Sequence, residues 1–77
     1  MADATTMPRL EPSIFRRFQK LLHEEAGIHL SDVKKPLVEG RLSKRLAQLD
    51  LPRFGDYLAR VLGDPAEKQV AIDLLTT

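Results

Sequence analysis

Hydrophobic residues recur at intervals of three and four positions along most of this sequence, which is the spacing of helices with one apolar side. The intervals fall into four segments, at about residues 11–26, 36–49, 54–62 and 65–75. No segment alternates apolar and polar residues over a strand length, and no turn signal of a β-hairpin is present. The pattern therefore predicts an all-α fold, a compact domain of four helices.

Glycine and proline mark the corner between the first two of these helices. Gly27 is placed to end the first helix in a left-handed conformation. Ser31 and Asp32 could cap the next segment through their side-chain oxygens. Because Pro36 has no N–H to donate, it resists a position deep in a helix, and regular helix should start near it, after an irregular turn.

Similar signals separate the third helix from its neighbours. Pro52 breaks the second helix, and Gly63 ends the third. Asp64 can cap the fourth helix, Pro65 suits its first position, and Glu67 stands where the acid of a capping box reaches back to the cap residue. The fourth helix should therefore begin sharply.

Length and composition set limits on the class of protein. The chain has 77 residues, enough for one domain, of which residues 1–10 predict a flexible leader and residues 11–77 the helical domain. Without cysteine it has neither disulfides nor a thiolate metal site, which favours the reducing cytoplasm. No signal-peptide core or membrane-spanning run is present, so direct membrane insertion is not expected.

Charge is uneven along the chain although the formal net charge is only +1. Residues 32–53 carry six basic and three acidic side chains, while the segments before and after are balanced or acidic. On a helical wheel, the second helix has an apolar stripe and an adjacent basic side. The apolar stripe consists of Val38, Leu42, Leu46 and Leu49, and the basic side of Arg41, Lys44, Arg45 and Gln48.

The sequence offers no convincing catalytic, cofactor-binding or metal-binding constellation. His23 and His29 flank Gly27 without other ligands at metal-site spacing, and adjacent acids such as Glu24 and Glu25 point in different directions on a helix. The four glycines form no phosphate-binding loop.

The basic side of the second helix remains, and it has several interpretations. It could be an ordinary solvated surface, or it could bind an acidic partner, because the planar guanidinium groups of Arg41 and Arg45 suit carboxylates. No acid of the second helix lies among these cations. A nucleic-acid-binding module is one alternative, although the small net charge disfavours nucleic acid, and a purely structural interaction domain is another.

Several sequence segments together resemble the N-terminal domain of the CheR chemotaxis-receptor methyltransferases. They are AGIHL at residues 26–30, SDVKKPLVEGRLSKRLAQLDL at 31–51, FGDYLARVL at 54–62 and LLTT at 74–77. Each segment alone is weakly specific, but their order and spacing extend over nearly everything after the leader.

The resemblance implies an enzyme as the parent of this domain. Family members transfer a methyl group from S-adenosylmethionine to glutamates on the glutamate-rich cytoplasmic helices of chemoreceptors. The family's C-terminal Rossmann-like catalytic domain binds the cofactor, and this chain ends before it, so we expect no catalysis and no cofactor binding by the chain itself. Its expected partners are the receptor helices, its own catalytic domain and a regulatory adaptor protein.

By position, the family's receptor-binding role falls on Lys34, Arg41, Lys44 and Arg45. A receptor helix rich in glutamate is negatively charged, so a basic helix would attract it and fix its register. Lys34 would join the other three only if the turn before Pro36 folds it alongside them.

Overall fold

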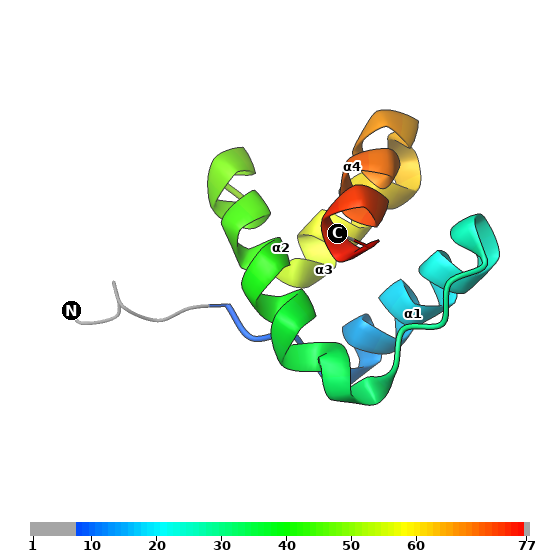
Figure 1. Ribbon diagram of the computed structural model, residues 1–77. Coiled ribbons are helices and arrows are strands. Elements are labelled where there is room, and N and C mark those ends of the chain that lie inside the picture. Colours follow the sequence, from blue (N-terminus) through cyan, green and yellow to red (C-terminus); the bar gives the residue numbers. More distant parts are fainter. Residues whose placement is uncertain (1–7, 77) are drawn as a thin grey trace.

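Four α-helices and one short 3-10 turn make up residues 8–76, the part of the chain that the computed structural model describes (Figure 1). The elements in chain order are α1 (Pro12–Ala26), η2 (Asp32–Lys34), α2 (Lys35–Leu49), α3 (Phe54–Gly63) and α4 (Pro65–Thr76). The described residues contain no strand, so the all-α prediction is confirmed. Residues 1–7 of the predicted leader, and Thr77, lie outside the described residues.

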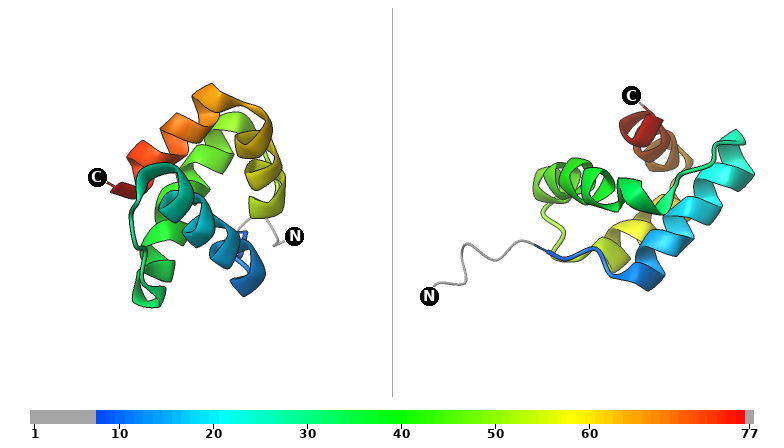
Figure 2. Two further views of the ribbon diagram at one scale, coloured as in Figure 1. Left: turned by 90° about the vertical axis from the view of Figure 1, so that its right-hand side faces the viewer. Right: turned by 60° about the horizontal axis from the view of Figure 1, so that its bottom comes forward.

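The third helix is the centre of the arrangement. It packs against α1, α2 and α4, and α2 also packs against α4 (Figures 1 and 2). The left view of Figure 2 shows α4 beside the C-terminal half of α2. The face shared by α2 and α4 is therefore built from segments about thirty residues apart in the sequence.

Fifteen buried apolar residues from all four helices and their connections form one core. The rings of Phe18 in α1 and Tyr57 in α3 stack at its centre, with centroids 6.3 Å apart and planes 25° apart. The predicted stripe of α2 is confirmed, since Val38, Leu42 and Leu46 are buried and Leu49 is partly buried against the core. Helix packing alone closes this core, because the chain has no disulfide.

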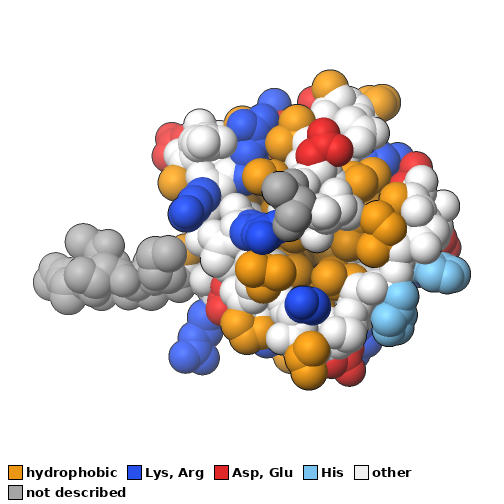
Figure 3. Space-filling model, viewed as in Figure 1, with side chains coloured by type: hydrophobic (Ala, Val, Ile, Leu, Met, Phe, Trp, Pro, Cys, Tyr) orange, Lys and Arg blue, Asp and Glu red, His pale blue; other side chains and the backbone are white. Residues whose placement is uncertain are grey.

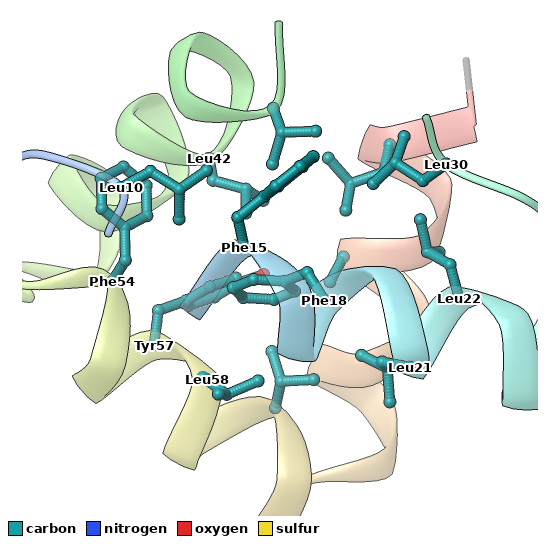
Figure 4. Packing of buried hydrophobic residues seen from close by; sticks show 14 of the residues in the cluster. Leu10, Phe15, Phe18, Leu21, Leu22, Leu30, Leu42, Phe54, Tyr57 and Leu58 are labelled. Atoms are coloured by element: carbon teal, nitrogen blue, oxygen red, sulfur yellow. The ribbon is translucent and has the colours of Figure 1, made fainter. Parts of the chain in front are cut away.

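Leu10 belongs to this core, although the sequence pattern placed it in the leader. Its side chain is 1% exposed, and its backbone N–H donates a 2.7 Å hydrogen bond to the Glu39 carboxylate of α2. Figure 4 shows Leu10 among the clustered side chains, at the end where Phe54 and Leu42 lie. A single apolar residue before the first helical turn therefore fastens the incoming chain to α2 and the core.

The corner after α1 follows the predicted backbone but not the predicted caps. Gly27 has a φ of 66° and donates its N–H to the His23 carbonyl, as expected of a glycine that ends a helix. Ser31 makes no side-chain capping bond, and Asp32 instead accepts a 2.8 Å hydrogen bond from Gln19 of α1. The capping prediction for this pair is wrong because Asp32 is used to join the corner to α1.

The last corner confirms one capping prediction and corrects another. The Asp64 carboxylate accepts hydrogen bonds from the N–H groups of Ala66 and Glu67, at 3.0 and 3.4 Å, and so caps α4 as expected. Glu67 does not complete a capping box, because its carboxylate turns into the protein and contacts Arg45 and Tyr57.

Candidate functional site

Arg45, one of the four predicted recognition residues, is fully engaged inside the domain. Its Nε and Nη2 atoms donate hydrogen bonds of 2.8 Å to the two carboxylate oxygens of Glu67, and its Nη1 donates to Gln48 at 3.0 Å. Only 26% of the Arg45 side chain and 5% of the Glu67 side chain are exposed. The acid that neutralises this arginine thus comes from α4, where an inspection of α2 alone could not find it.

Tyr57 of α3 completes a group that we call the Glu67 cluster, consisting of Arg45, Tyr57 and Glu67. The Tyr57 hydroxyl donates a 2.7 Å hydrogen bond to Glu67 Oε2, so the carboxylate receives donors from two different helices. The tyrosine is completely buried. Since each member comes from a different helix, the cluster ties α2, α3 and α4 together.

Ionisation in the Glu67 cluster follows from these contacts. The Arg45 hydrogen bonds lower the pKa of Glu67 below its ordinary value of 4.5, and the Tyr57 bond adds to this, against the opposing effect of burial. Burial and the Glu67 carboxylate raise the pKa of Tyr57, and Glu67 raises the pKa of Arg45. The arginine and the glutamate are therefore a charged pair near neutral pH, and the tyrosine stays protonated.

Arg41 lies one turn before Arg45 and reaches across to the end of α4. Its Nη1 donates a 2.8 Å hydrogen bond to the carbonyl of Leu74. The last carbonyls of a helix lack partners within the helix and carry partial negative charge, so a guanidinium is favourable there. The side chain remains partly exposed at the edge between α2 and α4.

Lys44 and Lys34 are the two predicted residues that face solvent. Both are exposed, and within residues 8–76 neither ammonium group has a recorded hydrogen bond or a carboxylate within 4 Å. Elsewhere on the surface, Lys20 and Lys68 each lie within 4 Å of a glutamate. Lys34 of η2 and Lys44 of α2 thus have no carboxylate of the described residues within 4 Å to offset their charge.

Two hollows follow one another along the junction of α2 and α4, and together they define what we call the α2–α4 face. The first, of about 390 Å³, is lined by Arg41, Lys44, Arg45, Gln48, Val70 and Leu74. The second, of about 330 Å³, is lined by Ile28, His29, Leu30, Ser31, Lys34, Leu37, Leu75 and Thr76. The structure therefore brings three predicted residues to one hollow and places Lys34 at the next.

Neither hollow of the α2–α4 face is lined by a carboxylate, which distinguishes it from other depressions on the domain. Another depression, of about 800 Å³, lies on the other side of α2 and is lined by Glu11 and Glu39 beside Arg9 and Lys35. Figure 3 shows Lys and Arg side chains following α2 on the α2–α4 face, with hydrophobic side chains between them. This face combines positive charge with an apolar floor.

Among residues 8–76 there is no group of three or more histidine, cysteine, aspartate or glutamate side chains that could hold a metal ion. No helix in the described range is long and apolar enough to cross a membrane. His23 and His29 are exposed on either side of Gly27.

Glu67 and Tyr57 are the residues that sequence reasoning missed. Glu67 was interpreted as a capping acid because it stands three residues after Asp64. A second signal was available, since Glu67, Ala71 and Leu75 recur every four residues and are all buried, which puts an acid in the apolar stripe of α4. An acid in such a stripe indicates a buried ion pair.

These features define a small helical domain with a basic face whose two hollows are lined by no carboxylate among residues 8–76. Its sequence matches the family described as the CheR methyltransferase, all-alpha domain, over residues 13–76. The chain belongs to this family, as the resemblance in its sequence motifs indicated.

Individual relatives agree with the family match. The chain is 44% identical over 70 residues to a chemotaxis protein methyltransferase of Klebsiella aerogenes and 41% identical over 70 residues to that of Salmonella typhimurium. It is 36% identical over 63 residues to chemotaxis protein methyltransferase 2 of Pseudomonas aeruginosa. The matches cover 82–88% of this chain but only 22–24% of each relative. The chain therefore spans about a quarter of the length of these enzymes.

Proposed function

We propose that this chain is the substrate-recognition domain of a methyltransferase that methylates glutamate side chains of chemoreceptors in the cytoplasm. The observation that carries the proposal is the α2–α4 face, where Lys34, Arg41 and Lys44 lie along hollows lined by no carboxylate. The names of the relatives support a chemotaxis methyltransferase as the parent enzyme. The occupant of the face is an acidic methylation helix of the receptor.

Arg45 has a different part in this proposal from the other three residues. Because its guanidinium is paired with Glu67, it adds little charge for a partner, and it acts as a positioning residue that holds α2 against α4. Lys44 and Lys34 supply the attraction, and Arg41 contributes at the edge of the face. The contact residues of the proposed site are therefore Lys34, Arg41 and Lys44.

Exposed ion pairs are individually weak, at about 0.2–1 kcal/mol each, and salt screens them. Three such contacts would not hold a receptor helix tightly. They would raise its encounter rate and favour one register over others, so that one glutamate at a time reaches the methyl donor. A face that steers without clamping suits a substrate that has to be released after each methyl transfer.

The methyl donor is expected to be S-adenosylmethionine, and the residues of this chain do not fit it. Within residues 8–76, Gly27 ends α1 and the other glycines stand singly in α2 and α3, so they form no glycine-rich loop. We therefore place the cofactor, and the chemistry, in the three quarters of the relatives that this chain does not match. The catalytic part of the same enzyme and a regulatory adaptor are further proposed partners.

Receptor methylation by the longer enzyme that carries this domain tests the proposal. Lys44→Glu should lower kcat/KM for the receptor several-fold at low ionic strength, and the defect should shrink as salt is added. Lys20→Glu, at an exposed lysine on α1, is the matched control and should leave the rate unchanged. Equal rates for both variants at low salt would exclude receptor recognition by this face. Arg45→Glu is not an informative variant, because it would place two negative charges in the Glu67 cluster.

A further inference from the structure

The α2–α4 face contains an apolar element that the basic residues do not explain. Three large hydrophobic side chains within the described range are exposed, and two of them are Val33 in η2 and Leu37 in the first turn of α2. Leu37 is 42% exposed and borders the hollow that Leu75 and Ile28 also line. Because it contributes little to the core, its apolar surface is available for contact with a partner.

Helical geometry places Leu37 in line with the cations. Leu37 and Lys44 are seven residues apart, which is about 20° short of two full turns, so both point to the same side of α2. They are separated along the helix axis by about 10 Å, and Arg41 lies between them. From the N-terminal end of α2 onward, the face therefore presents apolar Leu37 first, and then Arg41 and Lys44, which lie about one turn apart.

The order of these positions specifies what a partner must look like. A helix lying along α2 would need acidic side chains opposite Arg41 and Lys44, and an apolar side chain opposite Leu37, about one turn from the first acid and two turns from the second. Val70 and Leu74 of α4 supply additional apolar surface beside the basic pair. A helix with acidic residues alone would leave Leu37 exposed to water.

We propose that the α2–α4 face binds an acidic amphipathic helix whose leucine-like side chain rests on Leu37, with carboxylates about one and two turns away that face Arg41 and Lys44. The inference rests on the proposed function and makes it more specific: charge attracts the partner helix, and the apolar contact sets its register and direction. Since Leu37 lies at one end only, a helix docked in reverse would put its leucine beside Lys44. Reversed binding is therefore disfavoured.

Peptide binding to the 77-residue chain, followed by ¹⁵N NMR titration, tests this proposal. The first probe is a side-chain-stapled helical peptide, rich in alanine, with glutamates about one and two turns from a single leucine. The second has alanine in place of that leucine, and the third has the same composition with the leucine moved to the opposite side. The in-register peptide should bind about tenfold more tightly than the other two.

Protein variants assign the effect to a residue. Leu37→Ser should abolish the advantage of the leucine peptide, and the loss should be the same at low and high salt because it is not electrostatic. Leu62→Ser is the matched control, since Leu62 is 52% exposed but lies on α3, and it should leave the advantage intact. Lys44→Gln should weaken all three peptides, most strongly at low salt.

Each of the contrary results has a distinct meaning. If Lys44→Gln weakens the peptides but the leucine gives no advantage, the apolar register is wrong while the proposed function stands. If Lys44→Gln weakens none of them, the proposed function fails. Concentration-dependent shifts around Leu37 without peptide would assign the patch to a second copy of the chain. If Leu37→Ser lowers the thermal stability of the longer enzyme but does not change peptide affinity, the patch around Leu37 contacts another part of that enzyme. Either of these last results would overturn the inference.

Discussion

Replacing Arg45 with methionine should destabilise the domain far more than the same change at Lys44. Arg45→Met keeps the apolar stem but leaves the Glu67 carboxylate, whose side chain is 5% exposed, with Tyr57 as its one remaining donor. Removing one member of a buried ion pair costs about 3–5 kcal/mol. Because a quarter of the Arg45 side chain reaches solvent, we expect a somewhat smaller cost, about 2–4 kcal/mol.

That cost is a large share of the total stability. A domain of 77 residues has a free energy of unfolding of about 4–12 kcal/mol, so the Arg45 variant could lose half of it. Lys44→Met removes an exposed ammonium, and its effect should stay within about 0.5 kcal/mol. Urea unfolding monitored by circular dichroism at neutral pH measures both values.

A double substitution separates the ion pair from general packing at this position. Adding Glu67→Gln to Arg45→Met removes the buried uncompensated charge, so the double variant should be more stable than Arg45→Met alone. If the two substitutions were instead additive, or if Arg45→Met matched Lys44→Met, the Glu67 cluster would not hold the three helices together and the reasoning would be refuted.

Three further predictions concern stability. Leu10→Ala should lower the free energy of unfolding in urea by about 2–4 kcal/mol because Leu10 is 1% exposed. Arg9→Ala changes an exposed neighbour and should leave the stability unchanged; equal effects of the two substitutions would contradict the burial of Leu10 in the core. Because the native pKa of Glu67 is lowered, its contribution to stability is present above the ordinary value of 4.5 and is lost as the pH falls through the native pKa. A urea series in acid should therefore show a steeper loss for the parent chain than for Glu67→Gln, and parallel curves would contradict the charged pair. Gly40→Ala should increase the free energy of unfolding by about 0.5–1 kcal/mol and so raise the melting temperature, because an added Cβ at Gly40 meets nothing within 4 Å. Gly27→Ala should lower the melting temperature, because Gly27 has a φ of 66°.

Local signals explain why the helices could be predicted. Periodicity, Gly27, Pro36 and the Asp64 cap act within a few residues, and the structure follows them to within one or two positions at the helix ends. The end of α2 had a weaker signal. Asp50 has a φ of 59° there and donates its N–H to the Ala47 carbonyl, in a conformation that glycine usually supplies. Pro52, two residues later, indicated the end of α2 more strongly than Asp50 did.

The candidate site could be predicted in part. The sequence placed Arg41, Lys44 and Arg45 on one side of a helix, and the structure brings all three to one hollow. It could not show that Arg45 meets Glu67, because that contact joins residues 22 positions apart and depends on how α2 crosses α4. Leu10 was missed for a related reason, since a lone apolar residue has no periodic neighbours to mark it as buried.

The two sides of α2 are occupied by different kinds of residue. Leu42 and Leu46 point into the core, while Leu37 and Lys44 point away from it. Exchanges on the outward side leave the core packing intact, so they should cost little folding free energy. Under the proposed function, mutation can therefore change the binding preference of the face without unfolding the domain, and one scaffold can serve different partners.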